Sequence, residues 1–367
     1  MKKNLLLMFG GPSVEHDVSV ITAMQALKYI DHSAYNIIPF YWTNDGQFLT
    51  VYDPPLNPHE LLAKLAKKGV EVSIQNNHLL YKSGLFSIKP LTIDIAFPLF
   101  HGTGGEDGAV QGLLEALDVP YVGCNVSASA LGMDKILFKA IMHENKIPVL
   151  PYQAVNSPSD KVNIGFPVIA KPSHLGSSIG VAKADNQKQL TESFATIFQL
   201  DTQAIVEPYL TNMIEINCSV LGTAKACESS VCEQPISSSE ILSYADKYLH
   251  NGKGKKGAKG MASLDRRIPA PISEAESKKI KTYAENVFKV LGCSGVARVD
   301  FMIDQSNSNI YVTEINTIPG SLSFYLWEAS GLNYPDLIKR LFAIAVEQHQ
   351  IKHKLVRQYK SDILQKI

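Results

Sequence analysis

The sequence has few cysteines and no long hydrophobic run, and both absences exclude classes of protein. Its five cysteines are odd in number and form no CxxC pair. We expect reduced thiols that pack as small apolar side chains rather than a disulfide framework. No stretch approaches the ~20 apolar residues of a membrane span, and the apolar run from Leu5 to Phe9 is too short for the core of a signal peptide. We therefore predict a cytoplasmic protein without a membrane partner.

An excess of either charge is also lacking. The chain carries 35 Lys and Arg against 35 Asp and Glu, which argues against nucleic acid or another polyanion as a partner. What it does have is a globular composition, with 45% hydrophobic and 19% charged residues among 367, typical of a folded enzyme. Because this length exceeds one ordinary core, two or three domains are expected.

The first segment predicts an open α/β domain. Leu5 to Phe9 has the composition of a buried strand, Gly10-Gly11-Pro12 breaks it, and Ser13 can cap a helix that follows. Ligands of such domains gather at the carboxyl ends of the strands. Glu15 falls in the first helical turn, where it either complements the positive helix end or faces the ligand crevice and holds an ammonium group. The turn lacks GxGxxG, so a dinucleotide fingerprint is absent.

Two glycine-rich stretches predict close approach of the backbone to ligands. The strand from Ile93 to Phe100 ends at HGTGGEDG, residues 101–108, where a histidine and two carboxylates among four glycines favour a catalytic role. The strand from Phe166 to Lys171 leads into a hairpin that contains Ser177 and Ser178 between glycines. Its backbone N–H groups, hydroxyls and the ammonium of Lys171 suit an anion such as phosphate. A flexible serine-glycine hairpin is the alternative, and the sequence contains no P-loop.

The middle of the chain suggests a nucleotide slot beside a lid. Glu207 ends one predicted strand and Glu215 begins the next, so a linker between two small domains here can take adenine while a carboxylate binds the ribose; the alternative is two surface charges. After Lys247 and Tyr248, the run from Leu249 to Leu264 is rich in Gly and Lys. We predict a mobile lid that closes over phosphates, or a disordered loop.

A predicted hairpin gathers metal-binding side chains near the C-terminus. Strands at 296–303 and 310–315 flank an Asn-Ser-Asn turn. Arg298 and Asp300 are two residues apart, as are Glu314 and Asn316, so each pair faces one side of its strand. Carboxylate and amide oxygens suit Mg²⁺. The alternative is a cross-strand arginine–carboxylate pair on a solvated face.

Together these motifs resemble the D-alanine–D-alanine ligases, which are ATP-grasp enzymes. The resemblance runs from about Leu5 to Leu341, and its most specific parts are HGTGGEDGAVQG at 101–112 and EINTIPG at 314–320. It implies a three-domain α/β and α+β fold, in which an N-terminal open α/β sheet precedes two α+β domains that sandwich ATP. The corresponding boundaries are 1–124 for the substrate domain, 125–206 for the central domain and 207–367 for the C-terminal domain.

The resemblance also implies roles for single residues. Phosphates of ATP are expected at Lys135, Lys171, Ser177 and Ser178, and adenine and ribose at Glu207, Leu210 and Glu215, with Lys247 helping. Two Mg²⁺ ions, with Mn²⁺ as the alternative metal, are expected at Asp300, Glu314 and Asn316. Glu15, linked to Ser177 and Tyr248, faces the first amino acid's ammonium, His101 contacts substrate, and Arg298 with the Gly320 backbone stabilises the tetrahedral centre. The partners are small amino acids, and a homodimer is the family expectation.

The segment after Gly320 departs from the family. It is about four residues shorter, and no residue matches the serine that helps to hold the second D-alanine, so we expect Ser321 or Ser323 to take that role. The predicted reaction joins two D-alanines through an acyl phosphate for peptidoglycan precursors. Two alternatives are a related ATP-grasp ligase with another amine acceptor and a non-catalytic nucleotide-binding protein. The second has no need of the metal ligands and Arg298.

Overall fold

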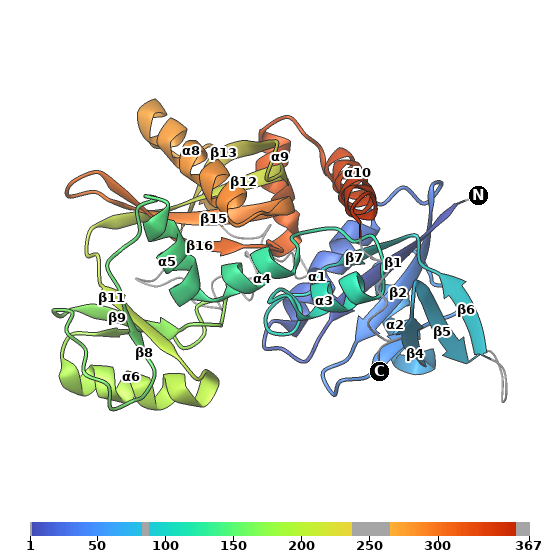
Figure 1. Ribbon diagram of the computed structural model, residues 1–367, viewed down its shortest axis with the longest axis horizontal. Coiled ribbons are helices and arrows are strands. Elements are labelled where there is room, and N and C mark those ends of the chain that lie inside the picture. Colours follow the sequence, from blue (N-terminus) through green and yellow to red (C-terminus); the bar gives the residue numbers. More distant parts are fainter. Residues whose placement is uncertain (1, 83–87, 237–264, 357–367) are drawn as a thin grey trace, which may run out of the picture.

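The computed structural model describes residues 2–82, 88–236 and 265–356, and these residues form three β-sheets (Figure 1). Lys247, Tyr248 and the predicted lid at 249–264 lie outside the described residues. In the part of the chain that is described, none of the helices is both long and apolar enough to cross a membrane. The predicted mixed α/β class is confirmed.

The first sheet has seven strands in the order β6-β5-β4-β3-β2-β1-β7. β1 pairs in parallel with β2 and β7, and the other pairings are antiparallel. Its elements are β1 (Lys3–Gly10), α1 (His16–Leu27), β2 (Tyr35–Trp42), β3 (Phe48–Thr50), α2 (Pro58–Lys68), β4 (Val70–Gln75), β5 (His78–Lys82), β6 (Ile88–Thr92), β7 (Ile95–Pro98) and α3 (Ala109–Ala116).

The run from Leu5 to Phe9 in β1 is apolar throughout because both faces of the sheet are covered there, as is usual for parallel strands. Leu5, Leu7 and Phe9 pack in the same core as the apolar face of α1, whereas Leu6 and Met8 pack with Leu114 of α3 and its neighbours. Successive side chains point to opposite faces of a strand, so the five-residue run serves two cores. The predicted opening strand and helix are thereby confirmed.

Ser13 was expected to cap α1, and that expectation is wrong. The helix begins at His16 with Glu15 at the N-cap position, and no side chain caps it. The hydroxyl of Ser13 instead accepts a hydrogen bond from the Glu15 N–H at 3.1 Å and donates to the carbonyl of His101 at 2.7 Å. This bond ties the turn after β1 to the loop after β7.

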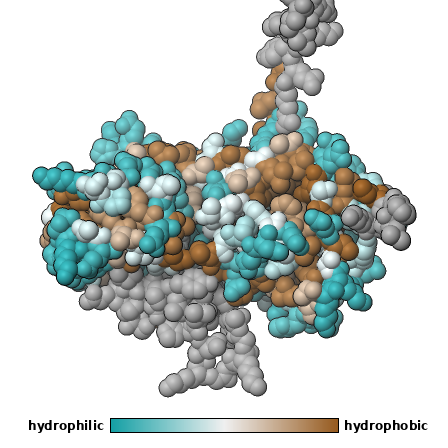
Figure 2. Space-filling view, turned by 90° about the horizontal axis from the view of Figure 1, so that it is seen from below, coloured by the Kyte–Doolittle hydropathy of each residue, from teal (hydrophilic) through white to brown (hydrophobic). Residues whose placement is uncertain are grey.

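The second sheet has four strands in the order β10-β9-β11-β8. Its apolar residues pack with Leu190, Phe194 and Ile197 on one face of α6. The elements of this region are α4 (Val126–Met133), α5 (Lys135–Glu144), β8 (Gln153–Val155), β9 (Val168–Pro172), β10 (Ala182–Ala184), α6 (Gln187–Leu200) and β11 (Ala204–Pro208). Viewed from below, polar residues dominate the lobe that holds α6, while hydrophobic residues gather on the lobe of the first sheet (Figure 2).

The third sheet has five strands in the order β14-β13-β12-β15-β16. Ser273 and Glu276 form the predicted capping box of the helix that covers it. The elements are β12 (Met213–Thr223), β13 (Cys227–Pro235), β14 (Arg266–Arg267), α8 (Glu274–Val290), β15 (Ser294–Asp304), β16 (Asn309–Asn316), the short 3₁₀ turn η2 (Gly320–Ser323), α9 (Phe324–Ala329) and α10 (Tyr334–His353).

The last helix returns to the first sheet (Figure 1). Leu341 and Phe342 of α10 belong to the core that contains Leu5 and Phe97, and the ring centroids of Phe97 and Phe342 lie 5.1 Å apart. The predicted boundaries 1–124, 125–206 and 207–367 stay a proposal, in which α10 is a C-terminal element seated on the first domain. The five cysteines are unpaired, and all except Cys227 are buried, as expected of small apolar side chains.

Candidate active site

A cleft lies between the second and third sheets. Lys171 and Glu207 line it from the second sheet, and Asp300 and Glu314 line it from the third. Its lining also includes predicted site residues Lys135, Ser178, Leu210, Glu215 and Arg298, together with apolar Ile169 and Met302. The cleft therefore combines apolar side chains that suit a flat ring with cations that suit phosphates.

The β15–β16 hairpin has the predicted geometry. Asp300 pairs with Glu314 and Arg298 with Asn316, and the register shifts just after Asp300. Arg298 donates from Nε and Nη2 to the two carboxylate oxygens of Asp300 at 2.6 and 2.7 Å, and Asn316 Nδ2 donates to Asp300 Oδ2 at 3.1 Å. Two carboxylates, one amide and one guanidinium share this face.

Arg298 is a fixed cation in this cleft. Its side chain is 7% exposed. This burial argues against the alternative interpretation, which placed an arginine–carboxylate pair on a solvated face. Burial alone lowers the pKa of Arg298, but the adjacent carboxylate of Asp300 raises it above its ordinary value. The guanidinium therefore stays charged and immobile.

Lys135 contacts both sides of the cleft: the loop between β9 and β10 in the second sheet, and the face of Asp300 and Glu314 in the third. It is the first residue of α5, whose N-cap Asp134 accepts hydrogen bonds from the N–H groups of Ile136 and Leu137. Lys135 Nζ donates to the carbonyl of Leu175 at 2.6 Å and lies 3.8 Å from Glu314 Oε2. Burial lowers the pKa of this lysine.

Glu207 lies between half-buried Lys171 and fully buried Lys139, and Lys139 was missed in the sequence. Its carboxylate is 2.6 Å from Lys171 Nζ and 2.5 Å from Lys139 Nζ. Burial raises the pKa of Glu207, but the two ammonium groups lower it to about 2. The available signal was the spacing of Lys135 and Lys139, which places two like charges on one face of α5. A role of Glu207 toward ribose stays a prediction.

Glu15 lies where the first domain meets the serine hairpin. The Ser177 hydroxyl donates to its carboxylate. A Cβ added at Gly102 would lie 3.0 Å from Glu15 Oε2, and one added at Gly176 would lie 3.1 Å from the same oxygen. The carboxylate is therefore enclosed by both predicted glycine loops, and it faces the crevice rather than only the end of α1.

The two carboxylates of the loop after β7, Glu106 and Asp107, have different surroundings. Asp107 accepts hydrogen bonds from the N–H groups of Gly104 and Ala109, which is turn chemistry. Glu106 is instead half-buried near His101, with His101 Nδ1 3.8 Å from Glu106 Oε2. Burial, with Glu15 adding to it, raises the pKa of Glu106 well above its ordinary value. Glu106 is thus a further candidate site residue. The glycine-rich motif contained it, but residue type alone did not distinguish it from Asp107.

His101 is neutral and held in place. Its Nε2 lies 3.1 Å from the hydroxyl of Thr22 on α1. Burial, followed by the positive charge of Arg298, lowers the pKa of His101 to about 3. The imidazole can therefore orient a neighbouring group by hydrogen bonding without carrying charge.

The segment from Gly320 to Ser323 is buried and has an unusual backbone. Ser321, Leu322 and Ser323 have φ values of 53°, 56° and 50°, which non-glycine residues adopt rarely and at some cost in energy. Ser321 donates from its N–H to Thr22 Oγ1 at 3.2 Å and from its hydroxyl to Gln25 Oε1 at 2.5 Å. The Ser323 hydroxyl is buried and has no hydrogen-bond partner in the described structure.

Comparison with known protein families covers most of the chain. Residues 4–124 match the family model described as D-ala D-ala ligase N-terminus, and residues 138–343 match the D-ala D-ala ligase C-terminus. The D-alanine–D-alanine ligase of Thermosipho melanesiensis is 39% identical over 359 residues, which is 95% of each protein. That of Acetivibrio thermocellus is 36% identical over 378 residues, covering 95% of this chain and 97% of the relative.

Solved structures agree with the sequence relatives. The D-alanine–D-alanine ligase of Coxiella burnetii superposes with a TM-score of 0.81 at 30% identity, covering 97% of this chain and 98% of that one. The VanG D-Ala:D-Ser ligase of Enterococcus faecalis gives 0.80 at 26% identity, covering 94% of this chain and 100% of that one. These similarities confirm the predicted three-domain ATP-grasp fold.

Proposed function

Because the chain belongs to the D-alanine–D-alanine ligase family, we propose that it joins two D-alanines while converting ATP to ADP and phosphate. The dipeptide is a precursor of peptidoglycan. The observation that carries this proposal is the convergence of Lys135, Lys171, Arg298, Asp300 and Glu314 on one cleft. A module that only bound nucleotide has no use for an oxyanion-stabilising arginine beside two carboxylates.

The first step activates a carboxylate, which is a poor electrophile at neutral pH. One carboxylate oxygen of the first D-alanine attacks the γ-phosphorus of ATP, ADP leaves, and an acyl phosphate forms. Lys135 and Lys171, with the serine hairpin, neutralise the phosphate charges. Glu15 binds the ammonium of this first D-alanine and orients its carboxylate toward the cleft.

The face formed by Asp300, Glu314 and Asn316 has the donor chemistry of a Mg²⁺ site. Asp300 and Glu314 oppose each other across the hairpin, and the Asn316 amide lies against Asp300 on the same face. We therefore propose these residues as the ligands of two Mg²⁺ ions, or of Mn²⁺. When bound there, such ions would supply positive charge that offsets the charge of the phosphoryl group.

In the second step the amine of the second D-alanine attacks the acyl carbon, and phosphate leaves. The negative charge that develops on the carbonyl oxygen needs a donor already in place. Arg298, aligned by Asp300, and the backbone N–H of Gly320 supply it. Neutral His101 orients the acceptor side of the site.

The acceptor is the place where a second candidate deserves consideration. The buried Ser323 hydroxyl, which lacks a protein partner, supports a role in holding the acceptor carboxylate. The shortened segment around it also supports an acceptor other than D-alanine, and a solved relative of similar fold is a D-Ala:D-Ser ligase. D-Alanine remains the leading acceptor because the chain's curated relatives are named for it.

Phosphate release from ATP across a panel of D- and L-amino acids tests the proposed function. We expect release with D-alanine alone, equal to the dipeptide formed, and little release with L-amino acids. Adding D-serine to D-alanine identifies the acceptor from the product. Release that needs an amino acid other than D-alanine as the activated substrate would contradict the proposal.

Four further predictions complete the proposal. We expect a homodimer, and hydrophobic residues on the lobe of the first sheet (Figure 2) are consistent with a contact surface there. A cytoplasmic location and the domain boundaries given above also remain predictions. Lys247 and Tyr248 are still assigned to the nucleotide and to Glu15 by resemblance alone.

A further inference from the structure

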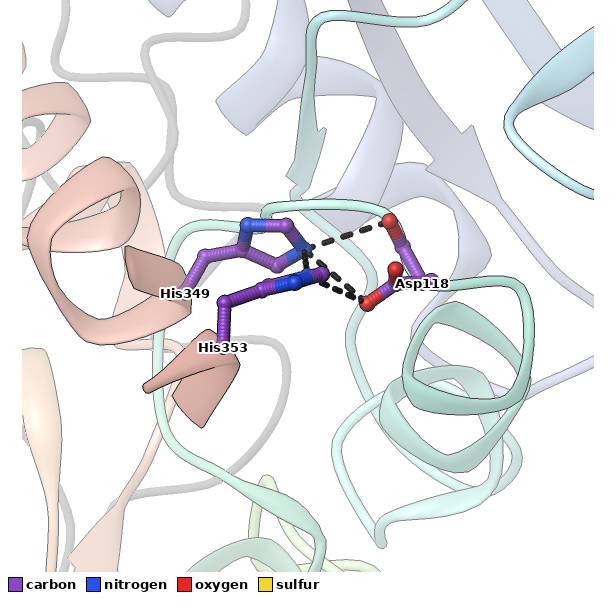
Figure 3. A group of neighbouring side chains, drawn as sticks. All are labelled: Asp118, His349 and His353. Atoms are coloured by element: carbon purple, nitrogen blue, oxygen red, sulfur yellow. Dashed lines mark hydrogen bonds and ion pairs between the residues drawn. The ribbon is translucent and has the colours of Figure 1, made fainter. Parts of the chain in front are cut away.

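A cluster of two histidines and one aspartate lies outside the cleft (Figure 3). His349 and His353 are four residues apart on α10, so they share one face of that helix. Asp118 comes just after α3 and has a left-handed φ of 54°. The rings converge on this carboxylate from a position more than two hundred residues away in the chain.

The three ligand-type atoms form a small triangle. Asp118 Oδ1 lies 2.9 Å from His353 Nε2 and 3.2 Å from His349 Nε2, and the two nitrogens are 3.2 Å apart. In a tetrahedral zinc site with bonds of about 2.0–2.1 Å, neighbouring ligand atoms are about 3.3 Å apart. The triangle thus has the size of one face of such a site.

We propose that Asp118, His349 and His353 bind a divalent transition-metal ion, with Zn²⁺ the first choice and water as the fourth ligand. Two imidazoles and one carboxylate favour Zn²⁺, Co²⁺ or Ni²⁺ over Mg²⁺. This distinguishes the cluster from the oxygen-rich face of the cleft. Asp118 and His353 are exposed, so an ion and its water can enter from solvent.

The cluster lies between α10 and the residue that follows α3, so a bound ion has a structural effect. It adjoins a second cleft, where Glu115, Asn125, Cys293 and Gln348 come together from separate parts of the chain. The Lys352–Glu115 ion pair already joins α10 to α3 there. A bound ion adds a coordinate link between the end of α10 and the first domain, and it therefore stabilises the folded state by mass action.

The test is zinc binding by the full chain after removal of metals. Competition against a chromophoric chelator, in excess Mg²⁺ to occupy the oxygen-rich face, compares the native protein with His349→Ala/His353→Ala. His59→Ala, which removes an exposed histidine from α2, is the matched control. We expect the double variant to lose one equivalent of zinc or at least tenfold in affinity, while the control behaves as the native protein.

Two further readouts keep the test decisive. Co²⁺ should give the intense visible bands of a tetrahedral site with the native protein and not with Asp118→Asn, and Zn²⁺ should raise the unfolding temperature of the native protein more than that of either variant. Ligase turnover without added zinc confirms that the variants are folded. Equal zinc stoichiometry and affinity in the native protein and the double variant would overturn the proposal. The cluster would then be two imidazole N–H groups that donate hydrogen bonds to one carboxylate oxygen.

Discussion

Lys139, Lys171 and Glu207 show how single residues set the charge of the cleft. A buried ion is costly unless it is paired, and here one carboxylate is shared by two ammonium groups. Lys171, which lines the cleft, keeps its charge because the attraction of Glu207 outweighs burial and raises the pKa of this lysine. Lys139, which is fully buried, serves the site by supporting this carboxylate.

Replacing Lys139 with Met should lower the free energy of unfolding by about 1–3 kcal/mol at pH 7, because the buried Glu207 carboxylate loses one partner. Since the pKa of Glu207 is lowered to about 2 in the folded state, its contribution is present above the unfolded value and is lost as the pH falls toward 2. The difference from the native protein should therefore shrink below about pH 4.5. Denaturant titrations at several pH values measure it.

Lys67→Met, at an exposed position on α2, is the matched control and should change stability little. A Lys139→Met protein as stable as the native one at pH 7 would show that Lys171 alone satisfies Glu207.

Glu314→Gln should remove most of the turnover while the fold survives. The substitution keeps the shape of the side chain and removes the charge that opposes Lys135 and that we assign to Mg²⁺. Steady-state rates as a function of Mg²⁺ concentration, with circular dichroism as the folding check, measure the effect. Near-normal activity with unchanged Mg²⁺ dependence would exclude the metal role.

At the scale of elements, the strands and their sequence spacing predicted the most. Alternation along 296–303 and 310–315 placed Arg298, Asp300, Glu314 and Asn316 on one face, and the observed register agrees. The Ser13 cap failed because α1 begins only at His16, so the Ser13 hydroxyl accepts from the N–H of Glu15 ahead of the helix. Its bond to the carbonyl of His101 is a long-range contact that local sequence does not encode. Lys139 was missed because its partner lies on another element 68 positions further along the chain, and the spacing from Lys135 indicates only that the two lysines share a face of α5.

The segment Gly320–Ser323 carries a prediction about the acceptor. Ser321 is engaged with Gln25, whereas the Ser323 hydroxyl is buried without a protein partner. Ser323→Ala should therefore raise the KM for the acceptor by roughly tenfold to a hundredfold, the equivalent of about 1–3 kcal/mol. The KM for the first D-alanine should stay the same, and Ser321→Ala should have the smaller effect. Unchanged acceptor kinetics in Ser323→Ala would remove this serine from the site.

At the scale of the whole molecule, α10 joins the C-terminal part of the chain to the first sheet. The helix follows the third sheet in the chain, yet its apolar face packs with β1 and β7 of the first sheet. The residues that we assign to the first amino acid, next to α1, and to metal, on β15 and β16, are thus held relative to each other by a shared core. Hydrophobic periodicity predicted the helix itself, but it cannot predict which sheet the helix packs against.

Phe342→Ala should destabilise the protein by about 3–5 kcal/mol. Its ring contacts Phe97 and Tyr35 with centroid distances of 5.1 and 5.0 Å, and the cavity would open between the helix and the sheet. Ile351→Ala, on the more exposed part of the same helix, should cost far less. Thermal unfolding of the two variants measures the difference, and equal losses would show that α10 is not anchored through Phe342.

The central claim is that the carboxylate of the first D-alanine becomes an acyl phosphate. D-Alanine labelled with ¹⁸O in both carboxylate oxygens tests it directly, because the oxygen that attacks phosphorus leaves with phosphate when the amine attacks. Mass spectrometry should find one ¹⁸O in the released phosphate for each D-alanyl-D-alanine formed. Phosphate free of ¹⁸O, released while dipeptide accumulates, would contradict the account.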